Sequence, residues 1–70
     1  MKTDEIYLHI GQRIQEERKA LGFLQQDLAQ EIGLLRTSIV NIEAGRQRLP
    51  IHKLYEIAEA LGVSISCLLP

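Results

Sequence analysis

Four side chains between residues 36 and 41 have types and spacings that suit contacts with the edges of DNA bases. At intervals of three and four residues, which place side chains on one face of an α-helix, the sequence holds Arg36, Thr37, Val40 and Asn41. An arginine can bind guanine through two hydrogen bonds, an asparagine amide matches the donor–acceptor pair of adenine, and a threonine can meet a thymine methyl. Ile39 and Ile42 fall on the opposite face. The segment therefore predicts a short helix that is apolar behind and polar in front, which suits a groove of DNA.

The residues before this segment predict a second short helix that packs against it. Leu28, Ala29 and Ile32 form an apolar stripe, and Gly33 follows where a helix end favours a left-handed residue. The same periodicity predicts a bundle whose helices span residues 4–21, 25–32, 36–44, 51–61 and 65–69. We expect Thr3 or Asp4 to cap the first helix and Ser64 to cap the last. The inward face of the first helix is expected to comprise Ile6 or Tyr7, Ile10, Ile14 and Leu21.

The helix–glycine–helix unit resembles the helix-turn-helix of the lambda repressor and Cro superfamily, the XRE type. The resemblance runs from GQRIQEERKALG through QQDLAQEIG and RTSIVNIEAGRQRLP to LYEIAEALGVSISCLL. The matching positions are Gln25, Ala29, Gly33, Ile39, Ile42, Glu43, Gly45, Pro50 and the segment ALGVS. It implies one all-α domain over residues 1–70, a compact five-helix bundle in which residues 1–9 extend the first helix and 10–69 form the matching core.

The resemblance also implies a function and a set of site residues. The expected function is sequence-specific binding of double-stranded DNA by a transcriptional regulator, a repressor, with the third helix in the major groove. The residues expected to contact bases are Arg36, Thr37, Val40 and Asn41. Gln25 and Ser38 match positions that hold the phosphate backbone, and Arg46 and Arg48 would add charge there. For each of these residues the alternative is a solvated surface side chain.

Arg18 and Glu43 match a pair that joins the first and third helices in lambda-type members of the family. The resemblance therefore implies a structural ion pair, and the alternative is that Arg18 touches phosphate. Such a pair orients helices and destabilises the fold strongly when only one partner is removed.

Charge is distributed unevenly along the chain, although the formal net charge is only −1. Residues 36–53 hold four basic side chains against one acidic side chain, whereas residues 1–35 and 54–70 are both net acidic. Phosphate contacts need local positive charge, and a low total charge should keep nonspecific DNA binding weak. The distribution is compatible with DNA binding through the third helix and the loop after it.

Leu24 and Leu35 stand where helices of this family usually begin after Ser, Thr, Asn or Asp. Leucine cannot accept a hydrogen bond from the free amides, so each costs roughly 1 kcal/mol of capping. Three explanations compete: side chains tucked into the core, leucines that read thymine methyl groups, or a surface adapted to a protein partner. The last gives the alternative function, an antitoxin- or adaptor-like protein-interaction module that uses the Leu24/Leu35 edge.

Other features of the sequence argue against an enzyme and bear on assembly. His9, His52 and Cys67 are scattered, form no zinc signature and suggest no catalytic group, so we expect no metal or cofactor. Cys67 is expected in the core or an interface. The chain lacks a membrane-length apolar run and a disulfide pair, which favours the cytoplasm.

Leu68 and Leu69 cannot both face so small a core, so we expect one to contribute to a weak homodimer that assembles on a palindromic operator.

Overall fold

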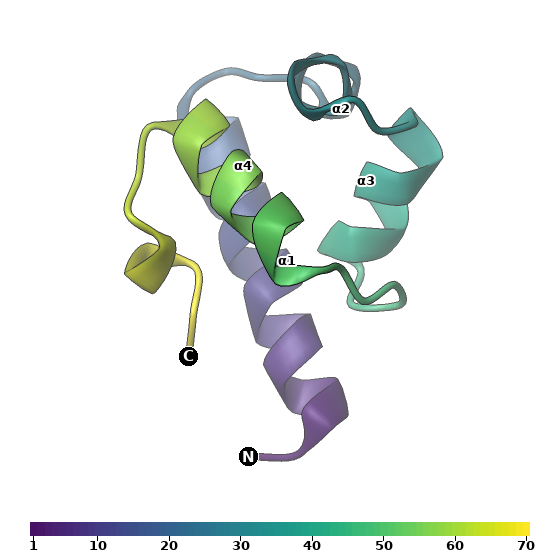
Figure 1. Ribbon diagram of the computed structural model, residues 1–70, viewed down its shortest axis with the longest axis vertical. Coiled ribbons are helices and arrows are strands. Elements are labelled where there is room, and N and C mark those ends of the chain that lie inside the picture. The colour runs from purple at the N-terminus through teal and green to yellow at the C-terminus, as the bar shows by residue number, and fades with distance from the viewer.

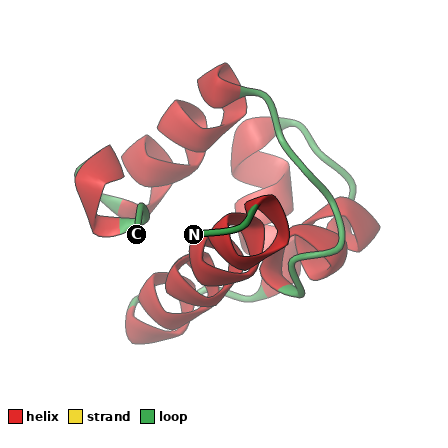
Figure 2. Cartoon of the chain, turned by 90° about the horizontal axis from the view of Figure 1, so that it is seen from below, coloured by secondary structure: helices red, strands yellow, loops and turns green.

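The computed structural model describes all 70 residues, which form four α-helices and one turn of 3-10 helix. The helices are α1 (Thr3–Ala20), α2 (Gln25–Ile32), α3 (Arg36–Glu43), α4 (Ile51–Leu61) and the 3-10 turn η1 (Ile65–Cys67). α2 packs against both α3 and α4, and α1 packs against α3 and α4 (Figure 1). Only helices and loops are present, which confirms the predicted all-α class (Figure 2).

The predicted fifth α-helix is wrong, because the segment forms only the single turn η1. Its backbone closes with hydrogen bonds from the Cys67 amide to the Ser64 carbonyl (3.0 Å) and from the Leu68 amide to the Ile65 carbonyl (2.9 Å). Pro70 has no amide hydrogen with which to continue the ladder. Ser64 does occupy the N-cap position, but its Oγ lies near Ser66 Oγ and Cys67 Sγ and caps no amide.

Helix boundaries elsewhere agree with the sequence to within one residue. α2 and α4 begin and end where predicted, α3 ends one residue earlier, and α1 is displaced by one residue toward the N-terminus. The cap predicted for α1 is wrong, because the N-cap residue is Lys2 and no side chain caps this end. Gly33 ends α2 with φ +68°, in the left-handed conformation that the sequence predicts.

The hydrophobic core lies where the four helices meet. Its buried side chains are Ile10, Ile14, Leu28, Ala29, Ile32, Ile39, Ile42, Leu54, Ile57, Ala58, Leu61 and Leu68. Ile10 and Ile14 are buried as predicted, and Ile6 and Tyr7 are partly buried. Leu21 was predicted to face inward but is exposed, because α1 ends at Ala20 and Gly22 (φ +75°) turns the chain away.

At Gly11 the backbone of α1 approaches the backbone of α3 closely. A Cβ atom at Gly11 would clash with the Ile42 carbonyl oxygen and would lie 2.7 Å from the Glu43 carbonyl oxygen. Both neighbours are backbone atoms, which cannot rotate away as a side chain end can. The glycine therefore lets α1 support the rear of α3 directly.

Candidate nucleic-acid interface

α3 lies at an edge of the bundle, with one face packed and the other open (Figure 1). Ile39, Ile42 and Glu43 are buried on the packed face. The four residues predicted to contact bases lie outside the core: Arg36 and Thr37 are exposed, and Val40 and Asn41 are half-buried. The structure thus places all four on the accessible part of α3, as the helical spacing predicted.

A buried ion pair fixes the rear of α3 to α1. Arg18 Nε donates to Glu43 Oε2 (2.6 Å) and Arg18 Nη2 donates to Glu43 Oε1 (3.0 Å), so the pair is bidentate. Arg18 Nη1 also donates to the Phe23 carbonyl at 2.7 Å, which ties the turn between α1 and α2 to the same pair. Both side chains are at least nine-tenths buried. The predicted contact between Arg18 and Glu43 is therefore present, and it links α1, α3 and the turn between α1 and α2.

Gln25 links this buried pair to the exposed Arg36. Its Nε2 donates to Glu43 Oε1 at 3.2 Å, and its Oε1 accepts from Arg36 Nη2 at 3.4 Å. Because an amide is both donor and acceptor, one side chain at the start of α2 can connect the end and the start of α3. Sequence reasoning assigned Gln25 only to phosphate and missed this link, since it depends on how the two helix starts come together.

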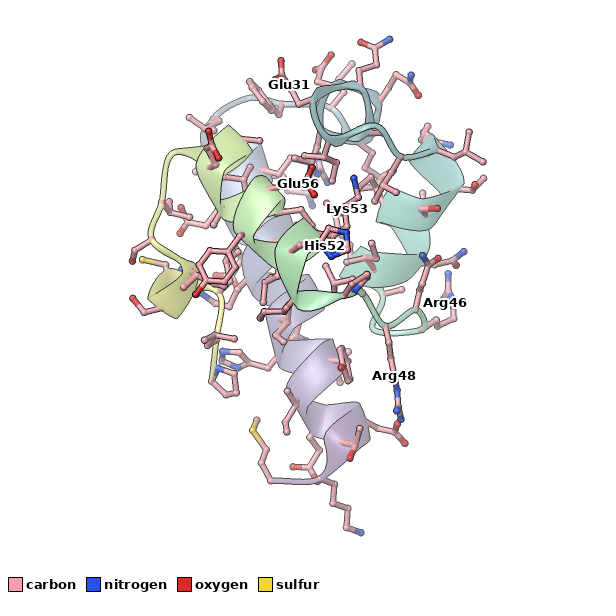
Figure 3. The ribbon with its side chains drawn as sticks, in the orientation of Figure 1. Glu31, Arg46, Arg48, His52, Lys53 and Glu56 are labelled. Atoms are coloured by element: carbon pink, nitrogen blue, oxygen red, sulfur yellow. The ribbon has the colours of Figure 1, made fainter.

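Asn41 and Arg46 form a second contact that the sequence did not reveal. Arg46 donates to Asn41 Oδ1 through both Nε (3.3 Å) and Nη2 (3.2 Å), and Figure 3 shows Arg46 beside α3. Recognition of adenine by asparagine uses this same oxygen as the acceptor for the adenine amino group. An Asn41–adenine contact therefore requires Arg46 to move, and a nearby phosphate would offer its guanidinium a stronger partner.

The remaining basic residues of segment 36–53 point in different directions. Arg48 extends toward the start of α1, where its guanidinium lies 5.3 Å from the centre of the Tyr7 ring and 3.9 Å from an Asp4 carboxylate oxygen (Figure 3). Lys53 Nζ donates to the Ile32 carbonyl at 2.7 Å, so its charge neutralises the C-terminal end of α2. The positive charge of the sequence segment is therefore less concentrated on α3 than its net charge suggests.

Leu24 and Leu35 are the N-cap residues of α2 and α3, and both are exposed. This excludes the explanation that their side chains are tucked into the core. At α2, Asp27 Oδ2 accepts from the Leu24 amide at 2.8 Å, which is one half of a capping box. The other half of a capping box is an N-cap side chain that accepts from a backbone amide of the first turn, and leucine has no such acceptor. The free amides at the starts of α2 and α3 therefore lack a side-chain acceptor.

Replacing both leucines with serine should raise the free energy of unfolding by about 0.5–2 kcal/mol per site. Each serine hydroxyl would accept from a free amide, and an exposed leucine gives up little packing in exchange. The same change places small polar groups where phosphates would approach, so affinity for random duplexes, which involves no base reading, should rise too. Chemical denaturation and duplex binding of the double variant test this. A less stable variant would show that the leucines pack better than their exposure indicates, and higher stability with unchanged DNA binding would favour the protein-contact alternative.

Comparison with known proteins gives the family. A model of the helix-turn-helix family matches residues 14–66, which include α2, α3 and α4. The chain belongs to this helix-turn-helix family. The predicted resemblance is thereby confirmed, and the short turn from Gly33 to Leu35 is the turn of the motif in this helix-turn-helix domain.

Two relatives are similar to this chain in sequence, and one solved structure is similar to it in fold. The domain is 44% identical over 57 residues to an uncharacterized transcriptional regulator in the ATPase CF(0) region of Rhodospirillum rubrum, a match that covers 81% of this chain and 53% of that protein. It is 36% identical to the cryptic phage CTXphi transcriptional repressor RstR of Vibrio cholerae, over 83% of this chain and 52% of the repressor. The chain thus spans about half the length of these relatives. The restriction-modification controller protein C.AhdI of Aeromonas hydrophila superposes with a TM-score of 0.86 at 30% identity, over 90% of this chain and 96% of C.AhdI.

The structure also shows where Cys67 lies and how apolar the helices are. Cys67 is exposed, so of its two predicted places the core is wrong, because Leu68 is buried there instead, and the interface stays a prediction. None of the helices combines the length and the apolar character that crossing a membrane requires.

Proposed function

We propose that this helix-turn-helix domain binds a short duplex sequence-specifically as the DNA-reading part of a transcriptional repressor, with α3 in the major groove. The observation that carries the proposal is the arrangement of α3: base-compatible side chains on its accessible face and a buried ion pair behind it. The family match and the regulators and repressor among its relatives support it. A recognition helix must be held rigidly on its buried face, because hydrogen bonds to bases tolerate little displacement.

The proposed contacts follow from position. Arg36 and Thr37 open α3, where residues first reach base edges in this docking mode, and Asn41 and Val40 follow one turn later. Arg36 would bind guanine, Asn41 would bind adenine once Arg46 turns to a phosphate, and Thr37 and Val40 would add smaller contacts. The proposed phosphate contacts are Gln25, Ser38, Arg46 and Arg48.

Binding should weaken steeply with salt if DNA is the partner. With Arg46 and Arg48 of two subunits neutralising about four phosphates, a rise from about 50 to about 200 mM monovalent salt should reduce affinity roughly 100-fold. Equilibrium binding of a fluorescent duplex measures this. The alternative, a protein-interaction module that docks through Leu24 and Leu35, predicts instead a protein partner whose apolar contact changes little with salt.

A second copy of the chain is the other proposed partner, because repressors of this kind read two-fold symmetric sites. Leu68 is fully buried, whereas Leu69 is 40% exposed, so Leu69 is the one of this pair that can contact another subunit. The C-terminal segment lies on the side of α4 away from α3 (Figure 1), and Arg13 Nε holds it to α1 by donating to the Cys67 carbonyl at 2.9 Å. A contact there leaves both copies of α3 free.

The isolated domain should therefore be at most a weak dimer, and Leu69→Glu should weaken it further by placing a charge in an apolar contact. Sedimentation equilibrium over a range of concentrations measures the association. Leu21→Glu is the matched control, because Leu21 is also exposed but lies at the end of α1. A tight dimer that survives Leu69→Glu would place the two-fold contact elsewhere.

A further inference from the structure

Leu35 is a large apolar side chain that the fold itself does not use. It is 74% exposed and stands at the N-cap of α3, directly before Arg36. At this position leucine both leaves the helix amides uncapped and exposes apolar surface to water. No side chain in the domain caps this helix start, and most of Leu35 remains in contact with water. A partner that covers Leu35 would remove that apolar surface from water.

The surroundings of Leu35 indicate what kind of partner this is. Its chain neighbour Arg36 lines a shallow pocket of about 350 Å³ between the starts of α2 and α3, together with Arg18, Leu24, Gln25 and Gln26, whereas Leu35 itself lies outside that lining. Arg18 is already paired with Glu43, so the free positive charge beside Leu35 is the exposed Arg36, and a charge there suits a polyanion better than an apolar protein surface. Leu35 is also continuous in sequence with Arg36 and Thr37, which open the face of α3 proposed to read bases.

The major groove presents one apolar group to a side chain such as leucine. This is the 5-methyl group of a pyrimidine, which thymine always carries and cytosine carries when it is methylated. In this docking mode the N-terminal residues of the recognition helix reach the base edges, and Leu35 immediately precedes them. A leucine there can contact the methyl group while Arg36 forms hydrogen bonds with the neighbouring base.

We infer that Leu35 is a specificity-determining residue that contacts the 5-methyl group of a pyrimidine next to the base that Arg36 binds. The inference rests on the proposed docking of α3 in the major groove. It explains why leucine at the N-cap is compatible with a DNA-binding surface: the stability lost in the free domain is offset by burial of apolar surface in the complex. Methyl recognition by Leu35 would add to the hydrogen bonds of Arg36 and Asn41.

The test removes the methyl group and the side chain separately. A duplex selected for tight binding is resynthesised with each thymine replaced in turn by deoxyuridine, and affinity is measured for the wild-type domain and for Leu35→Ala. At one thymine in each half-site the wild type should lose about three- to tenfold in affinity, as expected for one buried methyl group. Leu35→Ala should bind the thymine and deoxyuridine duplexes equally at that position. A thymine-to-deoxyuridine effect that Leu35→Ala never abolishes would overturn the inference.

Two controls separate this inference from the proposed function. Leu24→Ala removes a leucine of similar exposure from the N-cap of α2, and the preference for thymine should survive it. If Leu24→Ala abolishes the preference as Leu35→Ala does, the contact is not specific to Leu35 and the inference is wrong. If the wild type does not distinguish the selected duplex from random DNA, the proposed function fails before the methyl group is tested.

A further pair of duplexes distinguishes the two sources of the methyl group. At the sensitive position, 5-methylcytosine is compared with cytosine, each opposite guanine. Tighter binding of 5-methylcytosine by the wild type, absent in Leu35→Ala, would show that Leu35 recognises the methyl group on either pyrimidine. Equal binding alongside a Leu35-dependent thymine preference would identify thymine as the source.

Discussion

Replacing Glu43 with alanine should lower the free energy of unfolding by about 3–5 kcal/mol, because it leaves the buried Arg18 guanidinium without a counter-charge. The carboxylate also accepts hydrogen bonds from Gln15 (3.4 Å) and Gln25 (3.2 Å), so three side chains lose a partner at once. For a domain of this size the melting temperature should fall by at least about 12 °C. Thermal and urea unfolding followed by circular dichroism would measure both quantities.

Two further variants separate the charge effect from simple loss of packing. Glu16→Ala removes an exposed carboxylate that also pairs with an arginine, and it should leave the melting temperature almost unchanged. The double variant Arg18→Met with Glu43→Leu should be more stable than Glu43→Ala, because no charge is left buried alone. A Glu43→Ala domain about as stable as Glu16→Ala would contradict the structural role of the pair.

Replacing Arg36 or Asn41 with alanine should cost about 1–3 kcal/mol of specific DNA affinity, which is about 5- to 150-fold, while binding to random DNA hardly changes. Each side chain is proposed to meet a base edge, and such contacts exist only on the correct sequence. Competition of labelled specific duplex against unlabelled specific and random duplexes would measure both affinities.

Arg48→Ala is the matched control for Arg36→Ala, since it removes the same charge from a residue proposed to contact phosphate. It should weaken specific and random binding by similar factors and reduce the salt dependence. Equal losses on specific and random DNA for Arg36→Ala would reject its role in base reading. Arg36 donates a hydrogen bond to the side-chain amide of Gln25. Because Gln25→Ala removes this acceptor, it should reduce specificity as well as affinity.

The sequence predicted those features of the fold that depend on local pattern. Periodic apolar residues located α2 and α4 to the residue, and Gly33 marked the end of α2, because helix periodicity and left-handed glycine are properties of a few consecutive residues. The resemblance to a family identified the Arg18–Glu43 contact. The pattern did not predict how the helices end. The N-cap of α1 is Lys2 rather than Thr3 or Asp4, and the C-terminal segment forms a 3-10 turn rather than a fifth α-helix.

The candidate site was predicted less completely, for a related reason. Which side chains are exposed on α3 follows from the helix wheel, and that part was confirmed for Arg36 and Thr37. Hydrogen bonds between side chains of different elements depend on how the elements pack, and no spacing in the sequence encodes them. The contacts of Gln25 with Glu43 and of Arg46 with Asn41 therefore became visible only in three dimensions.

Selection from a pool of random duplexes tests the central claim most directly, with the wild type and Arg36→Ala carried through in parallel. The wild type should enrich a two-fold symmetric motif whose half-sites lie about one helical turn, 10–10.5 base pairs, apart. Arg36→Ala should lose a guanine preference at one position in each half-site and keep the others. Failure of the wild type to enrich any sequence, or an identical motif from Arg36→Ala, would contradict the account of α3 as the helix that reads DNA.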